Sequence, residues 1–260
     1  MTAAAAPSRA AVPNVSALTW VNIFTRLLAI QGSWNYETLI GNGVGFCVEP
    51  ALRLLPGGVH GPAFKAAMAR QSAYFNAHPY LASVAVGALA RAELSGVPAN
   101  HIERFRTALC GPLGSVGDRL VWAGWLPFCS LIGLLCFGLG AGPAAVLITF
   151  FVLYNAGHLT LRVWGLHVGW TRGLGVASAL GNPVLRYGPT HLARAAAATA
   201  GVAVPLTAAR LLGHHVALLG VVLGASALAA VVLVRLHGRV EGYKAALVLI
   251  ALFALVSVIR

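Results

Sequence analysis

The feature that most constrains this chain is a long stretch without charge, with one acid at its edge. No Asp, Glu, Lys or Arg occurs between Arg119 and Arg162, and Asp118, the only aspartate of the protein, comes just before it. Small or helix-breaking residues precede the acid: Gly111, Pro112, Gly114 and Gly117. An unwound segment at membrane depth exposes backbone groups that can line a transport site. Residues 108–127 are therefore predicted to form a broken turn that carries an acid at the mouth of a membrane segment.

The composition supports a membrane location. Of the residues 58% are apolar and only 9% are charged, and the mean hydropathy is +0.80, whereas soluble domains carry about 25% charged residues. The net charge of +12 comes from scattered basic residues, which favour cytoplasmic loops and the anionic lipid bilayer over nucleic acid. We expect an all-α polytopic membrane protein, with re-entrant or broken helices in the N-terminal two thirds followed by C-terminal transmembrane spans.

Three parts follow from the pattern along the chain: a disordered cytoplasmic tail (1–15), a core with re-entrant helices and a central hairpin (16–180), and C-terminal transmembrane helices (181–260). Amphipathic helices are predicted from Ser16 and over 64–75. Residues 80–90 are too few to cross roughly 30 Å of hydrocarbon at 1.5 Å per residue, so this segment is expected to be buried or re-entrant. A capping-box pattern at 100–103 predicts the start of a short helix.

Apolar segments make up the second half of the chain. Two of them are joined by glycines at 138–142 and form the predicted hairpin, and a basic, glycine-rich region at 162–194 is expected to be cytoplasmic or interfacial. The predicted apolar segments are 120–137 and 143–159 in the hairpin, then 195–212, 216–234 and 245–259. The distribution of Lys and Arg places the N-terminus in the cytoplasm, with five crossings if the hairpin spans fully.

The sequence contains no recognisable metal or cofactor motif. Its four cysteines lack metal-type spacing and are expected to be small core residues without disulfides. The pair His214 and His215 lies at a predicted turn without further ligands nearby, and the Gly41-x-Gly43-x-Gly45 run does not follow a strand, so close helix packing accounts for it better than a dinucleotide site. No cofactor and no metal are therefore expected.

Four runs of residues occur in the order found in one family of transport proteins. They cover roughly residues 20–180 and together resemble the IID membrane subunit of the mannose/fructose/sorbose-type phosphotransferase systems. The runs are Gln31-Gly-Ser-Trp34-Asn35-Tyr-Glu37; Tyr74-Phe-Asn76-Ala-His78-Pro-Tyr80; Gly111-Pro-Leu-Gly-Ser-Val-Gly117-Asp118 with Trp122; and Asn155 with Arg162-Val-Trp-Gly165 and Gly169-Trp170.

The resemblance implies partners and a mechanism. Such a IID subunit pairs with a homologous IIC subunit in the inner membrane of bacteria, and the two form the translocation path for a hexose-type sugar in a multimeric complex. Uptake is coupled to phosphorylation by the phosphoryl-carrier proteins IIA and IIB, so the membrane subunits contribute by positioning a sugar hydroxyl. The IID subunit itself is not the phosphoryl carrier.

The chain departs from the family pattern at several positions. Arg119 stands where a proline is usual, Leu126 where an arginine is usual, and Asn155 is followed by Ala-Gly-His158 instead of Val-Arg. The region after the fourth run is also short. These changes keep an alternative open: a non-transporting membrane subunit derived from IID, which recruits or regulates phosphotransferase components.

Eight residues are predicted to contact the sugar, and seven of them have a structural alternative. Asp118 offers a direct or water-mediated contact, or else caps a helix that begins near Arg119 or pairs with Arg119 or Arg162. In the first run, Gln31, Asn35 and Glu37 offer hydrogen bonds and Trp34 a stacking face. Alternatively, these residues hold unwound backbone or contact IIC.

The remaining predicted contacts come from the second and fourth runs. Asn76 and His78 lie at a helix end, where capping and turn formation are the structural alternative, and His78 is not expected to accept a phosphoryl group. Asn155 completes the set. The tryptophans of the later runs are expected to anchor the chain at the membrane interface.

Overall fold

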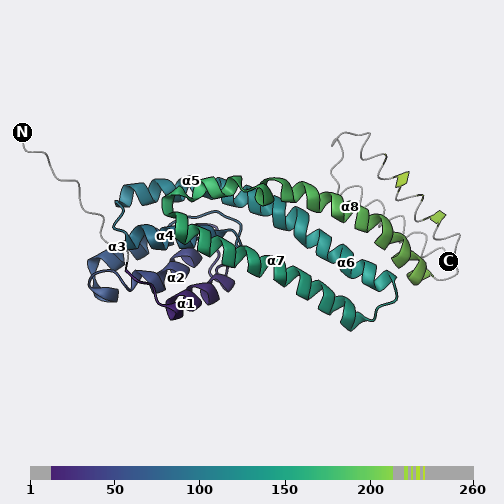
Figure 1. The fold of residues 1–260 in the computed structure, drawn as a ribbon, viewed down its shortest axis with the longest axis horizontal. Coiled ribbons are helices and arrows are strands. Elements are labelled where there is room, and N and C mark those ends of the chain that lie inside the picture. The colour runs from purple at the N-terminus through teal and green to yellow at the C-terminus, as the bar shows by residue number, and fades with distance from the viewer. Residues whose placement is uncertain (1–12, 213–219, 222–223, 225–226, 229–230, 232–260) are drawn as a thin grey trace, which may run out of the picture. The chain divides into compact units, whose positions relative to one another are not determined.

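A computed structural model describes residues 13–212 and positions 220, 221, 224, 227, 228 and 231 (Figure 1). This part of the chain is helical and contains no strand, which confirms the predicted all-α class. The short helices are α1 (Ala17–Leu28), α2 (Gly41–Leu52), the 3₁₀ helix η1 (Gly58–His60), α3 (Pro62–Ser72) and α4 (Ala82–Leu94). The longer part comprises α5 (Ala99–Gly117), the π-helical η2 (Asp118–Trp125), α6 (Leu126–Gly138), α7 (Pro143–Arg172), the 3₁₀ segment η3 (Gly173–Gly181) and α8 (Pro183–Leu212). The predicted tail, the turn at His214 and His215 and the two last predicted spans lie outside the described residues, apart from isolated positions.

Within the part of the chain that the structure describes, three helical stretches are long and apolar enough to cross a membrane: Ala99–Gly138, Pro143–Gly181 and Pro183–Leu211. The predicted hairpin is present around the turn at 139–142, and both of its arms belong to longer helices than predicted: the first ends the continuous helical stretch Ala99–Gly138, and the second, α7, runs to Arg172. The region 162–194, predicted to be cytoplasmic or interfacial, is mostly helical, since α7 continues to Arg172, η3 follows and α8 begins at Pro183. Gly165 and Gly169 of this region pack closely against α4, whereas Gly173 adopts a positive φ where α7 ends.

The predicted broken turn at 108–127 is wrong. Helix runs from Ala99 to Gly138 without interruption, and Pro112 lies inside α5. The segment from Asp118 to Trp125 is wound as a π-helix, the form in which single turns widen inside α-helices and which is common at functional sites. The capping box at 100–103 is also wrong, because α5 begins at Ala99 with Pro98 as its cap and has no side-chain cap.

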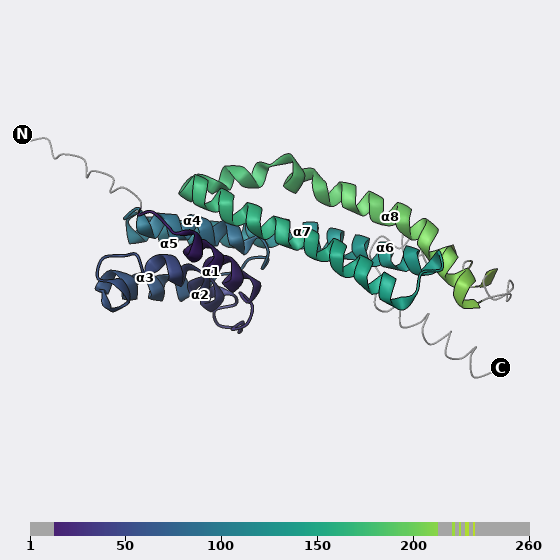
Figure 2. The ribbon, with the colours of Figure 1, turned by 60° about the horizontal axis from the view of Figure 1, so that its bottom comes forward.

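The chain divides into two compact units, and the first unit combines the residues up to Gly133 with Leu147–Thr199. Within it, α4 is buried along its length, as expected for a segment too short to cross. Figures 1 and 2 show α2, α3 and α4 packed together. Gly87 of α4 leaves no room for a side chain against the backbone of α7, and Gly165 and Gly169 of α7 leave none against α4. Small residues spaced by four let two helices approach closely in membrane proteins.

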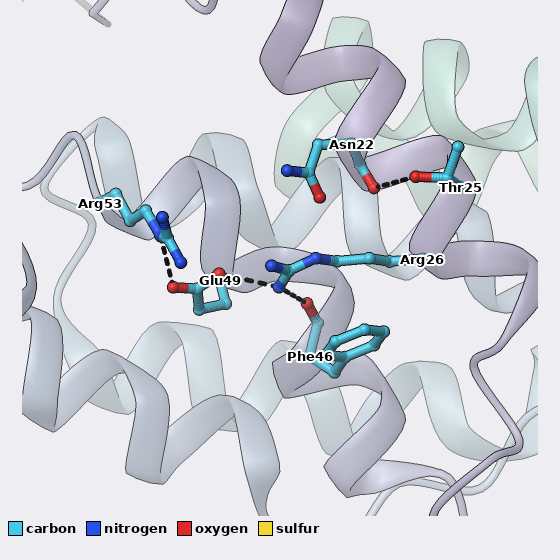
Figure 3. Close-up of polar contacts among 6 residues, drawn as sticks. All are labelled: Asn22, Thr25, Arg26, Phe46, Glu49 and Arg53. Carbon is cyan, nitrogen blue, oxygen red and sulfur yellow. Dashed lines mark hydrogen bonds and ion pairs between the residues drawn. The ribbon is translucent and has the colours of Figure 1, made fainter.

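The junction of α1 and α2 holds two of the three ion pairs found among the described residues. Glu49 accepts hydrogen bonds from Arg26 at 2.8 Å and Arg53 at 2.6 Å (Figure 3). Arg26 also donates to the carbonyl of Phe46 and stacks on its ring. In the same region, Gly41, Gly43 and Gly45 have no space for a side chain against neighbouring segments, which confirms their predicted role in close packing.

Four arginines bind backbone carbonyl oxygens, where a chain with more acids could offer carboxylates. Each donates to carbonyl oxygens at the C-terminal end of another helix, where the last carbonyls lack helical partners and the helix dipole is negative. The contacts run from Arg91 to Trp170 and Thr171, from Arg106 to Gln71, Ala73 and Tyr74, from Arg162 to Leu27, and from Arg210 to Phe137 and Ala141. Backbone carbonyls at helix ends therefore stabilise part of the positive charge of the chain.

Candidate functional site

A cluster of aromatic and basic side chains surrounds Tyr80 in the first unit. Tyr80 is buried and lies in the connection between α3 and α4. From α7 it is met by Tyr154, His158 and Arg162, which are spaced by four and so share one face of that helix. From the η2 segment it is met by Trp122, whose ring centroid is 6.0 Å from that of Tyr80. We call these residues, with His78, the Tyr80 cluster.

The contacts of α7 with Tyr80 are specific. The Tyr80 and Tyr154 hydroxyls are 2.6 Å apart. The Cζ atom of Arg162 lies 4.8 Å from the centroid of the Tyr80 ring, and the His158 ring lies 4.9 Å from it with an interplanar angle of 31°. Arg162 is almost fully buried, at 3% exposure, and donates to the Leu27 carbonyl at the end of α1. An arginine over an aromatic face gains cation–π attraction, which is stronger when both groups are removed from water.

His78 closes the other side of the cluster. It is 2% exposed, and its Nδ1 accepts a hydrogen bond from the backbone N–H of Tyr80 at 3.2 Å. Its ring centroid is 4.9 Å from those of Tyr80 and Trp122. Burial, and secondarily the charge of Arg162, lowers the pKa of His78 from 6.5 to about 4. His78 is therefore neutral at physiological pH.

The cluster draws on three of the four sequence runs. His78 and Tyr80 belong to the second, Trp122 to the third and Arg162 to the fourth, and Gly117 of the third lies so close to His78 that a side chain at 117 would overlap its ring. The segment that directly follows the first run lies beside the second run: the Ile40 N–H donates to the Phe75 carbonyl and the Phe75 N–H donates to the Thr38 carbonyl, both at 3.1 Å.

The eight predicted contact residues fall into two groups. His78 belongs to the Tyr80 cluster, and Asn155 is bonded to it, because its Oδ1 is 2.9 Å from His158 Nε2. The others lie outside it. Asn35 is occupied locally, since its Oδ1 accepts from the backbone N–H groups of Glu37 and Thr38 at 2.9 Å, which is an Asx-type turn. The exposed residues are Gln31, Trp34, Glu37, Asn76 and Asp118.

Two structural alternatives for these residues fail. Asp118 does not cap a helix, since helix continues on both sides of it, and it takes part in none of the three ion pairs found among residues 13–212. Asn76 does not cap α3, which ends at Ser72 with Ala73 as its cap. Both side chains are exposed and remain available to a ligand or partner.

Sequence reasoning did not select Tyr80, Tyr154, His158 and Arg162 as site residues. A signal was present: 154, 158 and 162 recur every four residues, and Arg162 is the first charge after the uncharged stretch. The predicted apolar segment 143–159 ends before Arg162, so it does not place Arg162 on the same helix as Tyr154 and His158. Extending the helix by one turn places all three side chains on one face.

A second buried polar group lies between α3, α4 and α5. Glu93 accepts two hydrogen bonds from Arg70, at 2.9 and 2.8 Å, and one from Gln71 at 2.6 Å. The Gln71 Oε1 accepts in turn from Arg106 at 2.6 Å. Arg106 also donates to carbonyls of the chain after α3 and stacks on Phe75. We call Arg70, Gln71, Glu93 and Arg106 the Glu93 network.

Two cavities of the first unit are lined mainly by apolar side chains. One, of about 480 Å³, lies between α1 and α7, where the Trp20 and Trp170 rings meet edge to face. The other, of about 490 Å³, involves the η2, α7 and α8 segments. Apolar walls of this kind suit acyl chains, whereas a sugar needs hydrogen-bonding groups of the kind that the Tyr80 cluster presents.

Comparisons with known proteins agree with the resemblance. The family described as the PTS system mannose/fructose/sorbose family IID component matches residues 14–187. The mannose-specific EIID component of Escherichia coli (strain K12) is 30% identical over 172 residues, which cover 63% of this chain and 59% of the relative. The sorbose-specific EIID component of Klebsiella pneumoniae is 32% identical over 176 residues, 64% of this chain and 61% of the relative.

Solved structures show the same fold. A cryo-EM structure of the mannose transporter ManYZ in complex with microcin E492 matches with a TM-score of 0.57 and 25% identity, over 72% of this chain and 69% of that one. The aligned part covers about three fifths of the length of the curated relatives. The family match extends over most of the chain and over all four sequence runs. The chain therefore belongs to the IID component family of the mannose/fructose/sorbose phosphotransferase systems.

Proposed function

We propose that this chain is the IID-like membrane subunit of a mannose-type phosphotransferase sugar permease. It forms the translocation path for a hexose-type sugar together with a homologous IIC subunit, and IIA and IIB phosphorylate the sugar as it enters. Family membership and the likeness to a mannose transporter structure support this proposal. The subunit lies in the bacterial inner membrane with its N-terminus in the cytoplasm and acts in a multimeric complex.

The observation that carries the proposal is the meeting of the family's sequence runs around Tyr80. Residues far apart in the sequence, such as His78, Trp122 and Arg162, pack on one ring. Aromatic faces with neutral and cationic donors are the groups that bind sugars by stacking and hydrogen bonding. Burying polar groups costs free energy unless hydrogen bonds compensate, so the retention of this set favours a binding role.

The exposed predicted residues have a second role in this proposal. Gln31, Trp34, Glu37 and Asp118 face away from the core, so they are positioned to complete the sugar path or the IIC interface when the partner is present. Asn35 supports this loop through its turn.

The test is sugar uptake coupled to phosphorylation in cells that lack other mannose-type permeases, with the native IIC, IIA and IIB proteins co-expressed. Wild type is compared with Asp118→Asn and Trp34→Ala at equal membrane abundance, across mannose, fructose and sorbose. We expect uptake by wild type and a clear loss in at least one variant. Absence of uptake from an assembled wild-type complex, with every sugar, would reject the permease proposal.

One set of observations favours the alternative function, a non-transporting subunit that recruits or regulates phosphotransferase components. Arg119 and Leu126 depart from the family pattern, and the family match ends at residue 187. Under this alternative, the complex still binds IIA or IIB at the membrane but accumulates no sugar phosphate. Co-purification of IIB with a transport-inactive complex would support it.

A further inference from the structure

Every buried side-chain nitrogen or oxygen that lacks a partner within the described residues belongs to the Tyr80 cluster. There are three such atoms: His78 Nε2, His158 Nδ1 and Arg162 Nε. The groups that carry them each pack on the same ring, within 4.9 Å of its centroid. A buried polar atom without a hydrogen bond is costly and rare. Their gathering in one place therefore points to a ligand.

The proton on His78 is fixed by its backbone contact. Because Nδ1 accepts from the Tyr80 N–H, it carries no proton, and the neutral ring must carry its proton on Nε2. The unpartnered Nε2 of His78 is therefore a donor. The Nε of Arg162 is a donor as well, since a guanidinium has no acceptor.

The proton on His158 follows from Asn155. The Asn155 amide nitrogen donates to the Phe151 carbonyl at 2.7 Å, which turns its Oδ1 toward His158. Because that oxygen only accepts, His158 Nε2 must donate to it. In the neutral ring His158 Nδ1 then carries no proton and is an acceptor. The cluster thus presents two donors and one acceptor without partners.

We propose that a hydroxyl-type oxygen, from bound water or from a sugar, occupies the Tyr80 cluster and satisfies His78 Nε2, Arg162 Nε and His158 Nδ1. A hydroxyl oxygen accepts two hydrogen bonds and donates one, which matches the set. Trp122, 41% exposed at the edge of the cluster, offers a face on which a sugar ring can stack. The sugar form of this site rests on the proposed function, whereas the water form does not.

Other ligand classes fit less well. A carboxylate or a fully ionised phosphate accepts from both donors but has no proton to give to His158 Nδ1. A metal cation would meet only one unprotonated nitrogen and would be repelled by the adjacent Arg162 charge. Among residues 13–212 no group of His, Cys, Asp and Glu suited to a metal occurs.

The test uses the full chain in complex with its IIC partner in lipid nanodiscs. Cryo-EM maps that resolve ordered water are compared without sugar and with saturating D-mannose. We expect density within hydrogen-bonding distance, about 2.6–3.2 Å, of at least two of the three atoms. Compact density in both maps identifies water, and a six-membered ring in the second map identifies a sugar subsite.

A matched pair of variants separates the two sources. His158→Phe removes the acceptor but retains an aromatic ring on Tyr80, and His167→Phe makes the same change at an exposed position of the same helix. For a sugar subsite, His158→Phe weakens binding of radiolabelled D-mannose about two- to tenfold, whereas His167→Phe does not. For bound water, the mannose affinity is unchanged and only the melting temperature of His158→Phe falls.

Two results would overturn the proposal. One is a map in which the three atoms are paired with protein groups, including groups of IIC, and no separate density contacts them. The other is equal mannose affinity and equal melting temperature for His158→Phe and His167→Phe. If the complex transports no sugar, compact density at the three atoms still supports the water form, so failure of the proposed function remains distinguishable.

Discussion

The two buried polar groups of the first unit differ in how completely their hydrogen bonds are formed. In the Glu93 network the carboxylate accepts hydrogen bonds from Nε and Nη2 of Arg70 and from the amide nitrogen of Gln71. The amide oxygen of Gln71 accepts in turn from Arg106. None of its buried side-chain atoms is without a partner. In the Tyr80 cluster three atoms are without one. Both groups are buried and cationic, so burial and charge alone do not separate them.

The difference indicates different roles. A network whose bonds are all internal fixes the arrangement of α3, α4 and α5 and has nothing left to offer a ligand. A cluster with donors and an acceptor to spare is held in place by stacking and by the Tyr80–Tyr154 contact, and retains binding capacity. We therefore infer a structural role for the Glu93 network and a binding role for the Tyr80 cluster.

The largest expected effect comes from breaking the Glu93 network. Glu93→Gln leaves the half-buried Arg70 and the buried Arg106 without an anion, and removing one partner of a buried pair costs about 3–5 kcal/mol. We expect the melting temperature of the purified complex to fall by roughly 6–20 °C, since 1 kcal/mol corresponds to about 2–4 °C in a chain of this size.

Glu49→Gln is the matched control. It removes the carboxylate between Arg26 and Arg53 (Figure 3), but Arg53 is 57% exposed and water can solvate it, so a smaller decrease is expected. Equal decreases for the two variants would contradict the structural role assigned to the Glu93 network.

The second effect tests the contact between α5 and the Tyr80 cluster. Gly117→Ala places a methyl group against the His78 ring, and overpacking of this kind costs about 1–3 kcal/mol. Gly114→Ala, one turn earlier in the same helix, has open space around it and gains helix propensity of up to about 1 kcal/mol. We expect the first variant to lose thermal stability and sugar binding and the second to retain both. Identical behaviour would show that the close contact at Gly117 is not needed.

The helices could largely be predicted from the sequence, because hydrophobic periodicity and length limit the choices. The amphipathic segment after Ser16 is α1, with Ser16 as its cap, and the segment at 80–90 is the core of the buried helix α4. The wrong prediction of a broken turn at 108–127 rests on the expectation that glycine and proline interrupt a helix. In this chain Gly165 and Gly169 serve helix contact and Pro112 lies within α5, and such tertiary packing outweighs local propensity.

The candidate site could be predicted only in part. The sequence predicts Asp118 and Trp34 as site residues, but both side chains are exposed and lie outside the Tyr80 cluster. Tyr80 and Arg162 are 82 positions apart in numbering, and nothing in the sequence states that α7 passes the α3–α4 connection. Long-range packing decides which polar residues meet. The number of buried atoms without a hydrogen-bond partner, which distinguishes the two buried groups, can therefore be read only from the folded structure.

A third effect concerns pH. The pKa of His78 in the folded chain is about 4, below its ordinary value of 6.5, so between these values the unfolded chain binds a proton that the folded chain does not. The stability contributed by neutral His78 is complete above pH 6.5 and is lost as the pH falls toward 4. We expect a loss of about 1 kcal/mol on going from pH 7.5 to 5.5. Melting curves of His78→Gln should fall less steeply over this range; parallel curves would contradict the assignment.

The smallest effect probes how firmly the Tyr80 cluster is held. Tyr154→Phe removes one hydroxyl of the 2.6 Å pair with Tyr80 but keeps the ring that stacks on Phe150. The loss of one hydrogen bond costs about 0.5–1.5 kcal/mol, so the melting temperature should fall by a few degrees, while Tyr187→Phe, at an exposed position, should leave it unchanged. If the hydroxyl pair only stabilises the fold, mannose affinity will not change. If it holds Tyr80 in place against His78 and Arg162, mannose affinity will fall together with thermal stability. The Tyr80 cluster will then differ from the Glu93 network in that its arrangement affects sugar binding as well as stability.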